Sequence, residues 1–209
     1  MGPSGDITVL RGTIVTCQDD PFLTDPAKAL RVETDGLVIC RNGIIEAVGT
    51  AAGLVSSLPA STPGASYSGC LVAPGFIDTH VHYVQTGIVA SFGGQLLDWL
   101  DRYAFPAEME FENASHAAAM AKIFCDELLR NGTTTALVFC AVYPQSVEAL
   151  FAEAEKRGMR IAAGKVLMDR NAPEGLRDTP QQGYDDSKTL IERWHGRGRS
   201  LYAITPRFA

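Results

Sequence analysis

The sequence predicts an α/β protein with a small β unit over residues 1–70 and a longer unit over residues 71–209 in which strands and helices alternate. Short β-rich runs around one hairpin signal indicate the first unit. Four apolar runs separated by three amphipathic segments indicate the second, and buried strands joined by helices pair in parallel. Such a series forms either a small open sheet or half of a (β/α)8 barrel.

The first unit is expected to be all-β. Its β-rich runs are Ile7–Leu10, Gly12–Cys17, Leu37–Cys40 and Ile44–Val48. The last two flank Asn42-Gly43, and an Asn-Gly step between apolar runs favours a type I′ hairpin because both turn residues need positive φ. The segment Ser56–Ser68 is rich in Ser, Pro, Gly and Ala, which predicts a loop.

The second unit is expected to hold a parallel sheet. Its apolar runs are Leu71–Thr79, Thr133–Cys140, Met159–Met168 and Leu201–Thr205. We expect the strands to lie parallel and adjacent in that order. Apolar spacing and end signals predict three connecting helices: Ser115–Arg130, one from Pro144 to Gly158, and one from Asp185 or Asp186 to about Gly196.

The composition argues against several classes of partner. The chain has 209 residues, a net charge of −6 and no basic patch, so nucleic acid and anionic membranes are not expected as partners. No apolar run is long enough to cross a bilayer, and the first residues lack the pattern of a signal peptide. Five cysteines without a C-x-x-C pair predict buried free thiols in a reducing compartment, and hence a cytoplasmic protein.

Two of the four histidines form the sharpest chemical feature, His80-Val81-His82. On a strand these histidines and Asp78 point to one face, and the two histidine backbones lie about 6.5–7 Å apart, so both rings can reach one metal ion. They also end the first strand, where barrel enzymes place their sites. The alternative is a half-buried strand that happens to carry two histidines, but the preceding Pro74–Ile77 and the βα pattern that follows favour a metal site.

The run Ala73–His82 resembles the first-strand signature of the amidohydrolase superfamily, and Gly43–Gly49 is similar to part of the β subdomain that flanks those barrels. Further segments resemble one family within it, the guanine deaminases: His80–Gln85, Leu96–Leu100, Phe105–Glu108, Gly132–Ala136, Gly164–Pro173 and Thr205–Ala209. One departure is Val84, where the family often has Pro. The resemblance implies an incomplete β subdomain followed by the first four strands of an amidohydrolase barrel.

The resemblance also implies a metal and a reaction. His80 and His82 would be two ligands of a single Zn²⁺ per full-length subunit. Guanine would be hydrolysed to xanthine and ammonia, because zinc lowers the pKa of its bound water and a carboxylate moves the protons. In the family that carboxylate and the remaining ligands, two histidines and an aspartate, lie on later strands. The catalytic carboxylate is therefore expected beyond Ala209, and the chain should be inactive alone; the full-length protein is expected to be a homodimer.

Five residues would bind the substrate. Gln85 would bond to the purine, since a carboxamide both donates and accepts and so matches the mixed N–H and C=O edge of guanine. Arg207 would reach the O6/N7 edge with its guanidinium fork, and Phe208 would pack on the ring face. Trp99 and Leu100 would form pocket walls, with a core position as the alternative for Trp99.

Other metal-binding patterns are weaker. Some amidohydrolases bridge two metals with a modified lysine, but the place of Lys165 on the third strand favours a structural or pocket role. Asp78 is expected to orient the two histidines, and His116 and His195 are expected to be exposed at helix ends. The zinc nucleobase deaminases of the other fold are excluded, because their H-x-E and P-C-x-x-C patterns are absent.

Two rival hypotheses remain at this point. The protein could be an amidohydrolase that acts on another amine, chloride or cyclic amide, although Gln85 with Arg207-Phe208 argues against it. It could also be a short product without catalysis, for example a partner-binding remnant.

Overall fold

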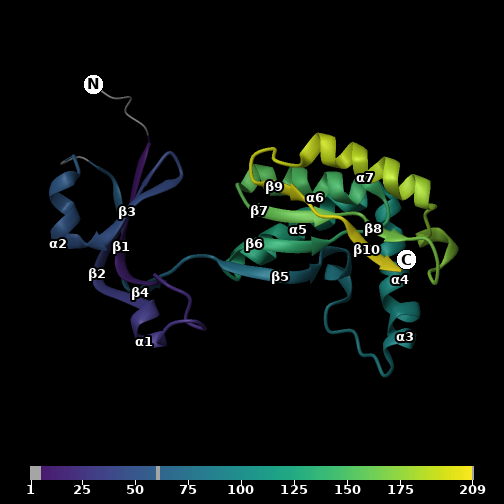
Figure 1. The fold of residues 1–209 in the computed structure, drawn as a ribbon, viewed down its shortest axis with the longest axis horizontal. Coiled ribbons are helices and arrows are strands. Elements are labelled where there is room, and N and C mark those ends of the chain that lie inside the picture. The colour runs from purple at the N-terminus through teal and green to yellow at the C-terminus, as the bar shows by residue number, and fades with distance from the viewer. Residues whose placement is uncertain (1–5, 60–61, 209) are drawn as a thin grey trace. The chain divides into compact units, whose positions relative to one another are not determined.

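The computed structural model describes residues 6–59 and 62–208, which fold as two compact units (Figure 1). The boundary between the units falls between Pro74 and Gly75, against residue 70 expected from the sequence. The difference arises because the last strand of the first unit continues to Val72. Within the described residues, no helix has the length and apolar character needed to cross a membrane.

The first unit is a four-stranded sheet in the order β3-β2-β1-β4. Its strands are β1 (Ile7–Cys17), β2 (Leu30–Arg41), β3 (Ile44–Thr50) and β4 (Gly64–Val72). Asn42 and Gly43 have φ of 52° and 77° between the antiparallel strands β2 and β3, which confirms the hairpin. The predicted loop Ser56–Ser68 is wrong from Gly64 on, because β4 pairs in parallel with β1; residues 60 and 61 of that loop lie outside the described residues.

Short helices complete this unit: α1 (Pro26–Ala29), α2 (Ala51–Leu54) and the 3-10 turn η1 (Val55–Ser57). Its core is small and consists of Val9, Leu37, Ile39 and Ala51 with a few partly buried neighbours.

The second unit contains the predicted parallel sheet in the predicted order. The strands are β5 (Phe76–His82), β6 (Thr133–Phe139), β7 (Arg160–Gly164) and β9 (Ser200–Tyr202), and each pairs in parallel with the next. The register of β5 against β6 shifts between Asp78 and Val81. Strict alternation of side chains is therefore interrupted in the stretch that contains His80.

Three long helices connect these strands: α5 (Ala114–Arg130), α6 (Pro144–Arg157) and α7 (Pro180–Trp194). The first two agree with the sequence prediction. Helix α7 begins at Pro180 rather than at Asp185 or Asp186, because Thr179 and Gln182 form a reciprocal capping box there. The sequence prediction placed the helix cap too late, because the capping box lies before both acidic residues in the chain.

The connection from β5 to α5 is a series of short helical segments that were not predicted from the sequence. These are η2 (Tyr83–Ile88), α3 (Leu96–Trp99), the π-helical η3 (Leu100–Ala104), α4 (Phe105–Met109) and η4 (Glu110–Glu112). Apolar side chains of η3 and α4 pack with Val142, Val166, Met168 and Leu176 in a second core cluster, whereas Tyr83, Val84 and Phe111 join the one under α5, α6 and α7.

Within the part of the chain that the structure describes, helices cover one face of the parallel sheet and leave the other uncovered. Ala136, Val138, Ile161 and Ala163 are buried against α5, α6 and α7. On the other face, Leu137, which lies between Ala136 and Val138 on β6, is 44% exposed, and Ile204, which follows β9, is 70% exposed. A cavity of about 290 Å³ lies on this uncovered side, and its lining includes His80, Leu137, Phe139, Ala162 and Ile204.

The third and fourth predicted strands are each broken into two. The run Met159–Met168 forms β7 and β8 (Val166–Met168) on either side of Lys165, and β9 is followed by β10 (Thr205–Phe208). Strands β8 and β10 pair in parallel as a separate two-stranded sheet. The backbones approach each other closely at the breaks, since a Cβ on Gly164 would lie 1.9 Å from the Ala203 carbonyl oxygen.

We predict that Gly164→Ala destabilises the protein by about 1–3 kcal/mol or more, because the added methyl must push the Ala203 carbonyl away. Gly94→Ala is the matched control, since a Cβ there would meet nothing within 4 Å. Urea unfolding of both variants and the parent measures the effect. Equal midpoints for Gly164→Ala and the parent would show that the break does not depend on this close approach.

Candidate functional site

His80 and His82 lie together at the carboxyl end of β5. Their ring centroids are 5.4 Å apart. Phe139, the last residue of β6, packs against both rings at 4.7 and 4.5 Å and is stacked on His82 at an interplanar angle of 10°. The parallel register makes His82 and Phe139 neighbours. The aromatic ring therefore restricts the orientations that both imidazoles can adopt.

His82 has the properties of a metal ligand. Burial, then the charge of Arg207, then His80 lower its pKa to about 4, so the imidazole is neutral at pH 7. Its Nδ1 atom is buried and has no hydrogen-bond partner among the described residues. A neutral imidazole with an unsatisfied nitrogen, beside a second imidazole, fits a cation that prefers nitrogen ligands, such as Zn²⁺. Over residues 6–59 and 62–208, however, no three His, Cys, Asp or Glu side chains gather as a complete ligand set.

The other candidate ligands each have partners other than the two imidazole rings. The Asp78 carboxylate accepts a hydrogen bond from the backbone N–H of His80 at 3.0 Å, so it holds the strand rather than a ring. His116 packs on Phe111 and lies 3.5 Å from Glu110, and is therefore partly buried rather than exposed. His195 is exposed, as expected, and its Nδ1 accepts from the backbone N–H of Tyr202.

Lys165 is fully buried in an ion-pair cluster. Its ammonium group lies 2.5 Å from Asp178 Oδ2 and 3.4 Å from Asp186 Oδ2. Two carboxylates thus compensate its charge, which supports the structural role rather than a modified metal-bridging lysine. The prediction of buried thiols is correct only in part: Cys125 and Cys140 are buried, whereas Cys17 and Cys70 are exposed.

Gln85 and Arg207 meet at one carboxylate, that of Glu108. The Gln85 amide donates from Nε2 to Glu108 Oε1 at 3.0 Å, and Arg207 donates from Nη1 to Glu108 Oε2 at 2.6 Å. The Glu108 side chain is 0% exposed and that of Arg207 is 12% exposed. Segments η2, α4 and β10, far apart in the sequence, are therefore joined by one buried charged group.

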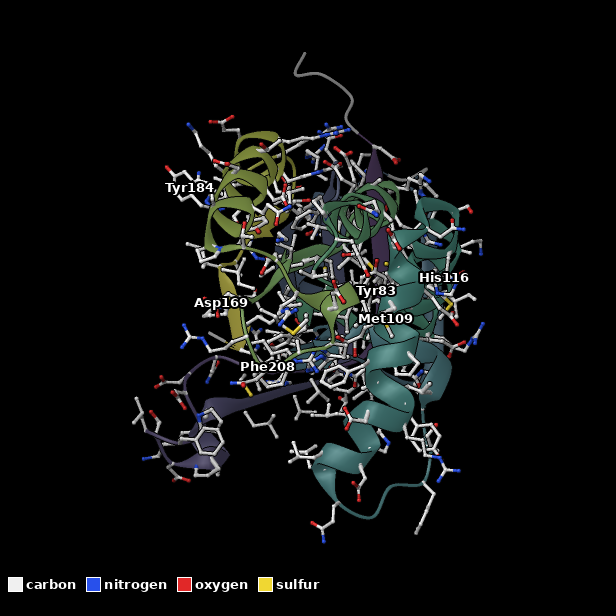
Figure 2. All side chains as sticks on the ribbon, turned by 90° about the vertical axis from the view of Figure 1, so that its right-hand side faces the viewer. Tyr83, Met109, His116, Asp169, Tyr184 and Phe208 are labelled. Carbon is white, nitrogen blue, oxygen red and sulfur yellow. The ribbon has the colours of Figure 1, made fainter. Side chains whose placement is uncertain are left out.

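Phe208 lies beside the same helix. Its ring centroid is 6.3 Å from that of Phe105, which precedes Glu108 by one helical turn on α4. The Arg207 guanidinium carbon is 5.4 Å from the Phe208 ring centroid. Met109 and Phe208, both labelled in Figure 2, pack on the second core cluster. One helix thus contacts both residues that the sequence singled out on the last strand.

A cavity of about 690 Å³ joins the histidines to part of the predicted binding set. Its lining includes His80, His82, Gln85 and Trp99. The Trp99 indole N–H donates to the Ser91 carbonyl oxygen at 3.2 Å, which holds the ring at the wall. Leu100 is buried in the second core cluster, so the structure gives it a packing position and not a place in this lining.

Two residues of this region were missed by sequence reasoning. Phe139 could have been found, because it ends the predicted strand beside that of the histidines and so shares their edge. Glu108 lies in a segment that resembles the guanine deaminases, but its burial could not be read from the residue type, since an acidic residue in a short helical segment is usually on the surface.

Comparison with known proteins finds similar sequences and structures that are named guanine deaminases. The guanine deaminase of Escherichia coli (strain K12) is 51% identical over 183 residues, which are 88% of this chain and 42% of that protein. The solved structure of E. coli guanine deaminase matches with a TM-score of 0.92 at 47% identity, covering 97% of this chain and 47% of the other. A guanine deaminase from C. acetobutylicum, solved with bound guanine in the active site, has a TM-score of 0.81 at 25% identity over 97% of this chain and 46% of its own.

The chain thus spans less than half the length of these relatives. The model of the amidohydrolase family matches residues 71–209. This range is most of the chain, and it includes the parallel sheet with His80, His82, Gln85 and Arg207. The chain therefore belongs to the amidohydrolase family.

Proposed function

We propose that this chain is the amino-terminal part of a zinc-dependent guanine deaminase, in which it supplies two zinc ligands and the groups that recognise the base. The observation that carries the proposal is the convergence of the histidine pair with Gln85 and Arg207. All lie at the carboxyl ends of parallel strands or on the segments that follow them. In barrel enzymes that end carries the active site.

The four parallel strands are the first half of a (β/α)8 barrel in this proposal. Parallel sheets bury both faces, yet here one face exposes Leu137 and Ile204. Closure by four further strands would cover that face and turn it into the barrel interior. The first unit, which ends at Pro74, then belongs to the small β subdomain, and the second, which begins at Gly75, to the barrel.

His80 and His82 are the zinc ligands of this chain in the proposal, with Phe139 limiting the rotation of their rings. The chemistry that zinc supplies in such a site is a water whose pKa is brought near neutrality for hydrolysis. The remaining ligands and the carboxylate that moves protons belong to segments beyond Ala209.

Guanine is recognised by Gln85, Arg207 and Phe208 in the proposal. The Arg207 guanidinium donates one N–H to Glu108 and keeps further donors for the O6/N7 edge of the base. Phe208 offers a ring face for packing on the purine. Trp99 lines the wall beside the histidines, and Leu100 supports it from the core.

The zinc assignment predicts that His82→Asn in the full-length gene product lowers bound zinc well below one per subunit and abolishes guanine hydrolysis. His116→Asn and His195→Asn are matched controls that should keep both, since neither residue lies with the pair. Metal analysis and ammonia release measure the two quantities. Full zinc content in His82→Asn, or its loss in a control, would contradict the assignment.

The recognition assignment predicts that Arg207→Lys reduces kcat/KM for guanine about tenfold to a hundredfold at unchanged zinc content. Lysine keeps the positive charge beside Glu108 but lacks the planar fork, and unpaired acceptors on the base cost about 1–3 kcal/mol. Alanine is a poorer test, because it would leave a buried carboxylate unpaired. Parallel losses of zinc and activity would instead mean that Arg207 maintains the fold.

The ligand assignment predicts that the 209-residue chain alone does not deaminate guanine at an enzymatic rate when zinc is added. It brings two histidines together, whereas a catalytic zinc usually has three protein ligands and a water. Purified chain, shown free of host deaminase, is assayed for guanine loss and ammonia release. Turnover at an enzymatic rate would mean that other residues of this chain complete the ligand set.

A further inference from the structure

The buried carboxylate of Glu108 is unusual among the charged groups of the second unit, because both of its described partners are side chains of the proposed recognition set. A fully buried carboxylate is expensive unless it is paired and hydrogen-bonded. Here an arginine compensates the charge and an amide donates a second hydrogen bond. The position of the Glu108 carboxylate is therefore determined by Gln85 and Arg207 and not by apolar packing alone.

The carboxylate also dictates how Gln85 is turned. An ionised carboxylate only accepts hydrogen bonds, so the amide nitrogen of Gln85 must face Glu108 and its Oε1 must face away. Gln85 lines the cavity that contains both histidines. With one N–H committed to Glu108, the group that Gln85 turns away from Glu108 is its acceptor oxygen, although a free carboxamide could present either group.

Arg207 is oriented by the same carboxylate. Its Nη1 is committed to Glu108, while its guanidinium carbon stays 5.4 Å from the Phe208 ring centroid. Phe105, on the same helical face as Glu108, packs on Phe208. Helix α4 therefore fixes an acceptor on Gln85 and a donor set on Arg207 together.

We infer that Glu108 is a positioning residue that makes Gln85 a hydrogen-bond acceptor and Arg207 a donor toward the substrate, and so selects a base with N–H groups beside a carbonyl. The inference rests on the proposed deaminase function and adds to it a residue that does not touch the base. Glu108 acts through the two side chains it holds.

The test is the isosteric variant Glu108→Gln in the full-length enzyme. Its amide oxygen keeps the bond to Arg207, so its NH₂ group faces Gln85, and the Gln85 amide must turn to present a donor where the substrate also has N–H. We expect kcat/KM for guanine to fall about tenfold to a hundredfold, mainly through KM, with zinc content unchanged. A kcat/KM within about twofold of wild type would overturn the inference.

The double variant Gln85→Glu with Glu108→Gln separates orientation from loss of structure. The amide introduced on α4 would donate to the carboxylate introduced on η2, whose second oxygen again presents an acceptor to the base. This variant should recover about tenfold or more of the activity lost in Glu108→Gln. If it is no better than the single variant, the orientation argument fails.

Glu148→Gln is the matched control. Glu148 likewise pairs with an arginine, Arg193, and accepts from a side-chain N–H, that of Trp194, but it lies on α6 outside the recognition set. It should leave kcat and KM for guanine unchanged, and a loss like that of Glu108→Gln would overturn the inference. Failure of the proposed function is seen separately, as a wild-type enzyme that binds zinc but does not hydrolyse guanine.

Discussion

The parallel pairing of β5 with β6, and of β8 with β10, is the constraint on which the site depends. Parallel strands bring their carboxyl ends to one edge, so His82 contacts Phe139 although the long helix α5 separates them in the chain. In the same way Arg207, on β10, lies beside α4, a helix that follows β5. A register shift of one residue would turn these side chains to the opposite face. Neither the histidine pair nor the Glu108 network would then form.

The break in the third and fourth strands determines where Arg207 lies. Gly164 lets the Ala203 backbone approach closely, and β10 continues along β8 rather than along β7. The carbonyl of Phe208 accepts from the backbone N–H of Asp169, which anchors the end of β10. Buried Lys165, held by Asp178 and Asp186, occupies the break itself. No non-glycine residue of β7, β8, β9 or β10 has positive φ, and the close approach is enabled by the missing side chain at Gly164.

Much of this arrangement is predictable from residue patterns. Apolar runs and helical periods predict the strand order, the hairpin at Asn42-Gly43 and the histidine pair at a strand end. One element that escaped prediction depends on contacts distant in sequence: β4 adds to a sheet despite a composition typical of loops. The start of α7 was missed for another reason, because its capping box of Thr179 and Gln182 is a local pattern that was overlooked in favour of Asp185 and Asp186. Glu108 escaped because its burial is compensated by partners 23 and 99 residues away, which no local pattern contains.

The most direct measurement is a crystal structure of the full-length protein with guanine, with anomalous differences collected at the zinc edge. We predict one zinc peak within bonding distance of both His80 and His82, and a base held by Arg207 and by the Oε1 atom of Gln85, with Glu108 bonded to both side chains. A zinc peak away from the two histidines, or guanine bound without Arg207 and Gln85, would contradict this assignment of the site.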